Sequence, residues 1–180
     1  DAGNPGTASF TTSFWIKYGS STAPAGNSYK FFLNNREVDD TSGWTVGSFD
    51  TSHFFIEGSG SQQRVIGLGE AWNLQNWHHV AVQYYPESSF TNGGGWKFII
   101  DGSNISTAAS NQDIQAVTNG VGSLLLGSGP NLTSPWIGNI DELTISSTLR
   151  SADWIKAEYD NQKSSQSLVS YGSVSGPRTI

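Results

Sequence analysis

The stretch that decides the fold of this chain runs Pro135-Trp136-Ile137-Gly138-Asn139-Ile140-Asp141-Glu142-Leu143-Thr144-Ile145-Ser146. Its alternation predicts a late β-strand, because successive side chains of a strand point to opposite faces. Leu143 and Ile145 are expected to face a core, and Ile140 the other side. Asp141 shares the apolar face, where a carboxylate is unfavourable unless it is hydrogen-bonded or bound to a cation. Two interpretations of Asp141 stay open: a capped or paired surface acid, and a calcium ligand.

The composition of the chain is that of a single all-β domain. Its 180 residues are enough for one full core, and no linker divides them. Charged residues make up only 13%, while 21 glycines indicate many turns. The formal net charge of −6 excludes nucleic acid as a partner, because no basic patch is present to neutralise phosphates. Binding of a cation or of a neutral glycan fits this charge.

Other features are informative by their absence. The chain has no Cys, which excludes disulfides and thiolate metal sites. It has neither a signal peptide nor an apolar run of membrane length, so we expect no membrane insertion. It also has no Met, even at position 1, so we expect a processed product or a piece of a longer protein.

About ten short strands separated by turns are expected. Their predicted positions are residues 10–18, 29–33, 44–49, 53–57, 63–68, 76–85, 96–101, 124–126 and the opening stretch. This pattern predicts an all-β fold, a two-sheet antiparallel jelly-roll sandwich with one short C-terminal helix.

The helix is expected at residues 151–162. Ser151 can cap it, and Asp153 favours its first turn. Ile155 and Tyr159 are spaced to lie on one helical face, which we expect to pack on the sandwich. The domain is expected to span residues 1–163. The Ser/Gly-rich tail at 164–180 is interpreted as either a linker or a segment with a last strand at 168–171.

Four sequence motifs follow one another along the chain. They are Phe14-Trp15-Ile16-Lys17, Trp77-His78-His79-Val80-Ala81-Val82, Trp96-Lys97-Phe98-Ile99-Ile100-Asp101-Gly102 and Gly138-Asn139-Ile140-Asp141-Glu142-Leu143-Thr144-Ile145. Their order is that of laminin-G-like, concanavalin A-like lectin/glucanase jelly rolls, which the chain resembles over roughly residues 3–160. The resemblance implies two curved sheets, glycan binding or adhesion, and often a bound calcium ion. Asp141 matches the acid that commonly serves this calcium, although the usual first strand is missing or very short here.

The catalytic pattern of the related glucanases is missing from the sequence. Those enzymes resemble one another in a strand with Glu-x-Asp-x-Glu, which puts an acid and a nucleophile on one face. Here Asp141 and Glu142 are adjacent, so they are expected to point to opposite faces. His78 and His79 diverge in the same way and cannot chelate one metal together; a core or hydrogen-bonded role is expected for both. We therefore expect no enzyme, and a glycan-cleaving activity is the least favoured alternative.

The seven Trp residues divide into two groups. Those inside patterned elements are expected to be buried: Trp15, Trp77, Trp96 and Trp154. Those near turns are candidates for a glycan platform, because sugar C–H faces stack on aromatic rings: Trp44, Trp72 and Trp136. Trp136 is alternatively a residue that fills an apolar position of the fold. Ligand hydrogen bonds are expected from Tyr84, Tyr85, Asn92 and Asn131.

The sequence thus predicts a non-catalytic carbohydrate-binding or adhesion module of an extracellular protein, with calcium as a stabiliser. Its partner would be a glycan or another cell-surface ligand. The main alternative is a structural or assembly module of a surface filament or virion, which would self-associate through its sheet edges. The missing first strand motivates this alternative, because a neighbouring chain could donate one.

Overall fold

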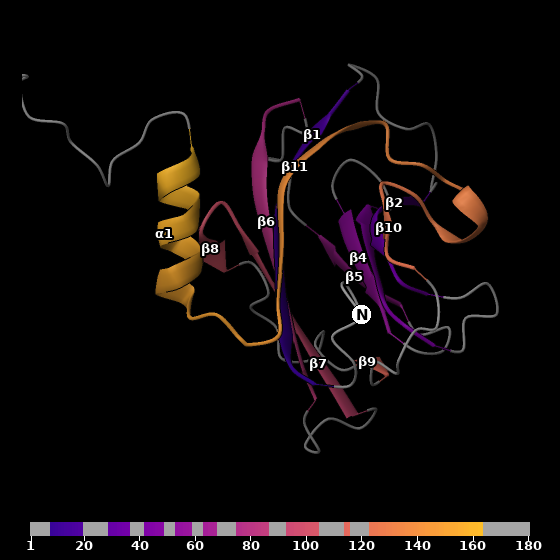
Figure 1. Cartoon of the computed structure of the whole chain (residues 1–180), viewed down its shortest axis with the longest axis horizontal. Coiled ribbons are helices and arrows are strands. Elements are labelled where there is room, and N and C mark those ends of the chain that lie inside the picture. The colour runs from indigo at the N-terminus through magenta and orange to yellow at the C-terminus, as the bar shows by residue number, and fades with distance from the viewer. Residues whose placement is uncertain are drawn as a thin grey trace, which may run out of the picture.

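The computed structural model of the chain has three layers: helix α1, a six-stranded sheet that we call sheet A, and a five-stranded sheet that we call sheet B (Figure 1). It describes residues 8–19, 29–36, 42–48, 53–58, 63–67, 75–86, 93–104, 114–115 and 123–163, and the findings below concern these residues. Helix α1 covers the outer face of sheet A, and the core lies between the two sheets.

The two sheets are built from antiparallel pairs only. Sheet A has the order β11-β1-β6-β7-β8, with β9 paired to β7. Its strands are β1 (Phe10–Tyr18), β6 (His78–Pro86), β7 (Gly93–Ile100), β8 (Ser103–Asn104), β9 (Ile114–Gln115) and β11 (Gly138–Ser146). Sheet B has the order β10-β2-β3-β4-β5. Its strands are β2 (Lys30–Asn34), β3 (Thr45–Ser48), β4 (His53–Glu57), β5 (Gln63–Gly67) and β10 (Leu125–Leu126).

This topology confirms the predicted jelly-roll sandwich. Neighbours in sheet A come from distant parts of the chain, since β1 lies between β11 and β6. The core is dominated by aromatic rings, as the abundance of Phe, Trp and Tyr in the sequence suggests. Phe10 belongs to it, and its ring centroid lies 5.0 Å from that of Trp44 and 5.6 Å from that of Trp96. Close aromatic packing of this kind stabilises a core beyond the area that it buries.

Strand β11 contains a β-bulge that the alternation of its sequence does not reveal. Two of its residues, Glu142 and Leu143, lie opposite the single residue Phe14 of β1. Glu142 has a φ of 51°, in the left-handed region. One extra residue reverses the alternation of a strand, so Ile140 and Leu143 both pack against the core. The prediction that Ile140 faces away from the core is wrong for this reason.

The same bulge moves Asp141 to the other face of the sheet. Asp141 pairs with Trp15, and directly paired residues of antiparallel strands share a face. The Trp15 ring lies against His79 and Tyr159, on the outer side of sheet A. The prediction that Asp141 lies at the mouth of the core is therefore wrong.

Helix α1 (Ala152–Gln162) is confirmed with its predicted cap. The Ser151 hydroxyl accepts a hydrogen bond of 3.1 Å from the backbone N–H of Trp154. Asp153 lies in the first turn, where a negative charge is favourable. Ile155 is fully buried and forms a small apolar cluster with Ala81 and Ile99 of sheet A.

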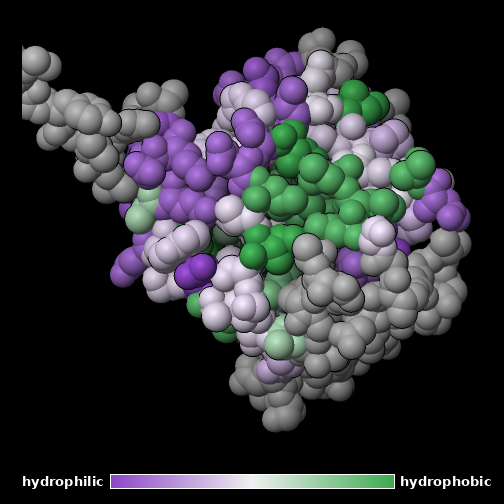
Figure 2. Space-filling model, in the orientation of Figure 1, coloured by the Kyte–Doolittle hydropathy of each residue, from purple (hydrophilic) through white to green (hydrophobic). Residues whose placement is uncertain are grey.

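An apolar area is exposed on the side of the sandwich where the edge strands β11 and β10 approach the viewer (Figure 2). Leu126 of β10 is exposed, and Ile140 and Leu143 of β11 are only partly buried. The tail at 164–180 lies outside the described residues, so the predicted last strand and domain boundary stay predictions. Among the helices of the described chain, none has the length and apolar character needed to cross a membrane.

Candidate ligand-binding face

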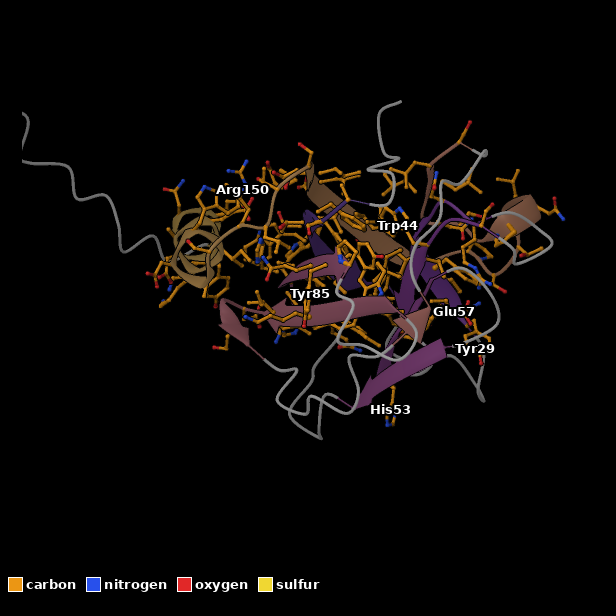
Figure 3. All side chains as sticks on the ribbon, turned by 90° about the horizontal axis from the view of Figure 1, so that it is seen from below. Tyr29, Trp44, His53, Glu57, Tyr85 and Arg150 are labelled. Carbon is orange, nitrogen blue, oxygen red and sulfur yellow. The ribbon has the colours of Figure 1, made fainter. Side chains whose placement is uncertain are left out.

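Trp44 does not lie where the glycan platform was predicted. Its side chain is 0% exposed and belongs to the core between the sheets. Figure 3 shows it inside the sandwich. A ring with no exposed face cannot stack on a sugar, so the prediction for Trp44 is wrong. Trp44 lies two residues before Val46 of β3, so the two side chains point to the same side of the sheet, into the core.

Trp136 is also a core residue. It is 8% exposed, and its ring packs edge-on against Phe32 at 4.7 Å and Tyr18 at 5.2 Å. This fits the alternative interpretation, in which Trp136 fills an apolar position, and rules out a stacking surface here. Burial raises the pKa of Tyr18 above its ordinary value. Trp72 lies outside the described residues.

The predicted hydrogen-bonding residues have different surroundings. Tyr84 is fully buried against Phe10 and Trp96, at 5.6 and 5.0 Å, so the prediction that it contacts a ligand is wrong. Tyr85 is half-buried, and Asn92 lies outside the described residues. Asn131 is exposed in the short 3₁₀ helix η2 (Pro130–Leu132), with a φ of 55°. Asn131 therefore remains a candidate.

Two Trp residues that were predicted to be buried are exposed. Trp154 lies on the solvent side of α1, where the Arg150 guanidinium stacks over its ring at 4.6 Å. Trp77 is exposed immediately before β6. Trp15 and Trp96 are buried as predicted.

The described side-chain contact of Asp141 lies within the bulge of β11. One carboxylate oxygen of this exposed residue accepts a 2.9 Å hydrogen bond from the backbone N–H of Glu142, within the bulge. Calcium takes six to eight oxygen ligands. In the described part of the chain, no group of three His, Cys, Asp or Glu side chains is placed to hold a metal. The hydrogen bond matches the interpretation of Asp141 as a capping acid.

The two adjacent histidines have structural contacts, as predicted. The His78 ring nitrogen Nδ1 lies 2.7 Å from Asp101 Oδ2, and Asp101 Oδ1 accepts a 2.9 Å bond from the backbone N–H of His79. Asp101 and Gly102 both have positive φ, which suits the tight turn between β7 and β8. His79 is buried under α1, with its Nε2 3.5 Å from Glu158.

The outer face of sheet B carries a cluster of aromatic side chains that we call the aromatic face: Tyr29, Phe31, His53 and Phe55. The ring of Phe55 packs edge-on against Tyr29 at 5.1 Å and against Phe31 at 5.5 Å. Phe55 is fully buried, whereas Tyr29 is 36% exposed and His53 is partly exposed. In Figure 3, His53 points away from the sandwich, and Tyr29 lies on the same side of the molecule. These two residues present an aromatic surface to solvent.

Gly47 makes this cluster possible. It is paired with Phe31 on one side and Phe55 on the other. A Cβ at this position would lie 2.5 Å from the Phe55 ring and 2.2 Å from the Lys30 carbonyl oxygen. The absent side chain leaves room for two rings to meet above the strand.

The loop between β10 and β11 borders the aromatic face with polar groups. Its Pro135 forms a bridge to Phe31, and the Phe31 N–H donates to the Ser134 carbonyl at 3.4 Å. A Cβ on Gly129 would lie 2.6 Å from the Phe31 ring, which shows how closely the loop approaches. Asn131 and Thr133 are exposed on this loop. The loop that contacts Phe31 thus carries an exposed amide and an exposed hydroxyl, with the exposed apolar side chain of Leu132 between them.

An ion pair lies at the other end of the same face. Arg36 Nη1 bonds to Glu57 Oε2, and the two side chains are only 5% and 15% exposed. Glu57 shares this face with His53 and Phe55, because the three alternate along β4. The positive charge of Arg36 is therefore neutralised by Glu57 at this end of the face.

The aromatic face was not predicted from the sequence, although two pairs of adjacent Phe residues indicate it. Phe31 is followed by Phe32, and Phe54 by Phe55. Adjacent residues of a strand point to opposite faces, so each pair puts one ring in the core and one on the outside. Phe32 and Phe54 do lie in the core, with their ring centroids 5.2 Å apart.

Residues 1–156 match the family model of the concanavalin A-like lectin/glucanases superfamily. The chain belongs to this superfamily. A comparison with curated proteins found no match. The expected family resemblance is thereby confirmed over most of the chain.

Solved structures share the fold at low identity. The chain is similar to a heptameric SAP-like pentraxin from Limulus polyphemus, with a TM-score of 0.62 and 14% identity over 90% of this chain and 74% of that one. It is similar to the CBM40 of the Ruminococcus gnavus IT-sialidase, solved with α2,3 sialyllactose, with a TM-score of 0.59 and 15% identity over 86% and 84%. The binding domain of Paraclostridial Mosquitocidal Protein 1 gives a TM-score of 0.59 and 13% identity over 88% and 38%.

Proposed function

We propose that this chain is a non-catalytic carbohydrate-binding module of an extracellular protein, and that it holds its glycan on the aromatic face of sheet B. The observation that carries the proposal is the Tyr29 ring, which is 36% exposed and packs edge-on against Phe55. A sugar ring can stack its C–H face on such a ring while its hydroxyls bond to the exposed polar groups of the neighbouring loop. The likeness to a sialidase CBM40 and to a toxin binding domain supports binding as the role of the fold.

Glycan-array binding of the wild type and of Tyr29→Ala tests this proposal. We expect the wild type to bind at least one glycan and Tyr29→Ala to lose about tenfold in affinity, the loss of about 1.4 kcal/mol that removal of a stacking ring implies. The matched control is Trp154→Ala, since Trp154 is 39% exposed on the opposite side of the molecule. An equal loss in both variants, or no glycan bound by the wild type, would reject the proposed site.

A catalytic role is tested separately. The acids of β11 are the adjacent Asp141 and Glu142, not a pair spaced two residues apart as in the Glu-x-Asp-x-Glu pattern of the glucanases. We therefore expect no reducing ends to be released from common polysaccharides at high protein concentration. Steady release by the purified wild type would replace a binding module with a glycosidase.

Calcium remains part of the proposal as a stabiliser, with Asp141 as the ligand to test. The melting temperature is measured with calcium, with a chelator, and for Asp141→Asn and Asp141→Ala. A calcium site predicts that the chelator lowers the melting temperature of the wild type and of neither variant. A purely capping role predicts no chelator effect and a lower melting temperature for Asp141→Ala in both conditions, through the lost bond to Glu142 N–H.

The assembly-module alternative is favoured by one observation, the exposed apolar area beside β11 and β10 (Figure 2). Such a surface next to an edge strand can accept another chain. Light scattering of the purified chain tests it. Stable oligomers without any glycan binding would support this second role over the first.

A further inference from the structure

The charges of the aromatic face bear on which glycans it takes. Apart from the histidine His53, the charged side chains among its described residues are Arg36 and Glu57, and they are bonded to each other. Lys30 belongs to the same strand as Phe31 but has the opposite parity, because it pairs with Ser48. In the described part of the face, the arginine that could bind a carboxylate ligand is already paired with Glu57, and no lysine points toward the ligand.

The rim of the face is uncharged as well. Residues 114–140, which include the whole loop against Phe31, contain no Asp, Glu, Lys, Arg or His. Its exposed polar side chains include the Asn131 amide and the Thr133 hydroxyl, which donates to the Pro130 carbonyl at 2.7 Å. Amides and hydroxyls both donate and accept hydrogen bonds, which suits sugar hydroxyls.

A sugar acid would need a different site. Burying its carboxylate against rings is unfavourable without a charge-assisted partner, typically arginine in a bidentate contact. Arg36 has that chemistry, but Glu57 occupies it, and its side chain is 5% exposed. The net charge of −6 adds long-range repulsion of an anionic ligand.

We propose that the aromatic face selects uncharged glycans and rejects glycans that carry a carboxylate. This inference rests on the proposed function. It separates the chain from its structural neighbour, the CBM40 that was solved with sialyllactose. In this protein, Glu57 occupies the Arg36 guanidinium, which among the described residues of the face is the group that would otherwise bind the carboxylate of an acidic sugar.

Matched pairs of neutral and acidic glycans test the selectivity by titration calorimetry. The probes are lactose with α2,3 sialyllactose, and β1,4-mannohexaose with β1,4-mannuronate hexamer, alongside the array that tests the function. We expect the neutral member of any bound pair to bind at least tenfold more tightly. Equal or tighter binding of the acidic member overturns the selectivity while the carbohydrate-binding function stands. No binding to any glycan on the array overturns both.

The variant Glu57→Gln tests the mechanism. It removes the Glu57 carboxylate that bonds to the Arg36 guanidinium, so the neutral-to-acidic affinity ratio should fall at least fivefold. Asp153→Asn is the control, because it makes the same charge change at an exposed site on α1. An equal shift in the two variants would assign the selectivity to net charge and reject the role of the ion pair.

A salt titration of the wild type gives a second measurement in case Glu57→Gln does not fold. Raising the salt concentration from about 20 to 500 mM screens repulsion by the net charge. It does not supply the hydrogen-bonding partner that a bound carboxylate would need. We therefore expect the preference for the neutral member to persist at high salt. Its disappearance there would overturn the local mechanism.

Discussion

The two sheets of this sandwich have outer faces that differ in what lies on them. Helix α1 covers the outer face of sheet A, and the residues beneath it are tied to the helix by polar contacts. Ser13 Oγ donates to Glu158 Oε1 at 3.1 Å, and Trp15 Nε1 donates to Gln162 Oε1 at 2.6 Å. The outer face of sheet B carries the aromatic face, where Tyr29 and His53 remain partly exposed.

The difference separates a face covered by a helix from the face that we propose binds a glycan. On sheet A, the aromatic ring Trp15 has its polar atom satisfied by the helix and its flat surface stacked on Tyr159 at 5.8 Å. On sheet B, the Phe55 ring packs edge-on against Tyr29, and the Tyr29 side chain remains 36% exposed to solvent. Exposure alone does not single out Tyr29, since Trp77 and Trp154 are also exposed; its packing against Phe55 is what makes it the proposed contact for a sugar ring.

The largest loss of stability is expected when the buried ring that packs against Tyr29 is removed. Phe55→Ala removes a fully buried ring, so we expect the free energy of unfolding to fall by about 3–5 kcal/mol. Glycan affinity should fall too, because Tyr29 loses the ring that orients it. Urea denaturation and calorimetry measure the two effects. A loss below about 1 kcal/mol would mean that Phe55 is not packed as described.

The next effect concerns the covered face alone. Ile155→Ala removes the apolar contact of α1 with Ala81 and Ile99 and should lower the free energy of unfolding by about 2–5 kcal/mol. Glycan affinity should stay unchanged, since α1 lies on the other side of the molecule. Leu149→Ala, at an exposed position, is the control for removing an aliphatic side chain. Weakened glycan binding by Ile155→Ala in conditions where it is folded would contradict the division between the faces.

A smaller effect is expected from the cap of α1. Ser151→Ala removes the acceptor for the Trp154 N–H and should lower the free energy of unfolding by about 0.5–2 kcal/mol. Ser147→Ala, at an exposed position just ahead of the helix, is the matched control. If the two variants denature at the same urea concentration, the cap does not hold the helix.

The smallest effect is a pH dependence at the C-terminal end of α1. Hydrogen bonds from Lys156 at 2.5 Å and Lys163 at 2.6 Å hold the pKa of Asp160 below its ordinary value. A lowered pKa in the folded state stabilises the protein above the unfolded pKa, and this contribution is lost as the pH falls below about 4. Asp160→Asn should therefore lose less stability than the wild type between about pH 6 and 3. Parallel stability curves would show that the ion pairs contribute nothing.

Most of the fold could be predicted because its signals are local. Strand β4 has the predicted bounds, His53–Glu57, and α1 begins after its predicted cap, Ser151. Alternation, turn residues and a capping hydroxyl each act within a few residues of chain. The bulge at Glu142 breaks this rule, because its positive φ depends on how β11 aligns with β1, and no glycine marks it.

The candidate site was harder to predict because it depends on which side of a sheet a residue faces. Trp44 was assigned to the surface from its nearness to a turn, yet its parity with Val46 puts it in the core. Tyr29 and Phe55 are brought together across three strands, with Gly47 between them. That juxtaposition requires the pairing of the strands, which a single sequence does not specify.

The bulge in β11 has a consequence for the solubility of the protein. In the described part of the chain, β11 ends sheet A and borders an exposed apolar area, a combination that invites sheets of different copies to join (Figure 2). Asp141 and Glu142 put two negative charges in the middle of this edge, and the bulge interrupts its regular hydrogen-bonding ladder. Both are means by which natural proteins prevent edge-to-edge aggregation. We therefore expect these two acids to limit aggregation at this edge, and a variant lacking both to aggregate more readily than the wild type.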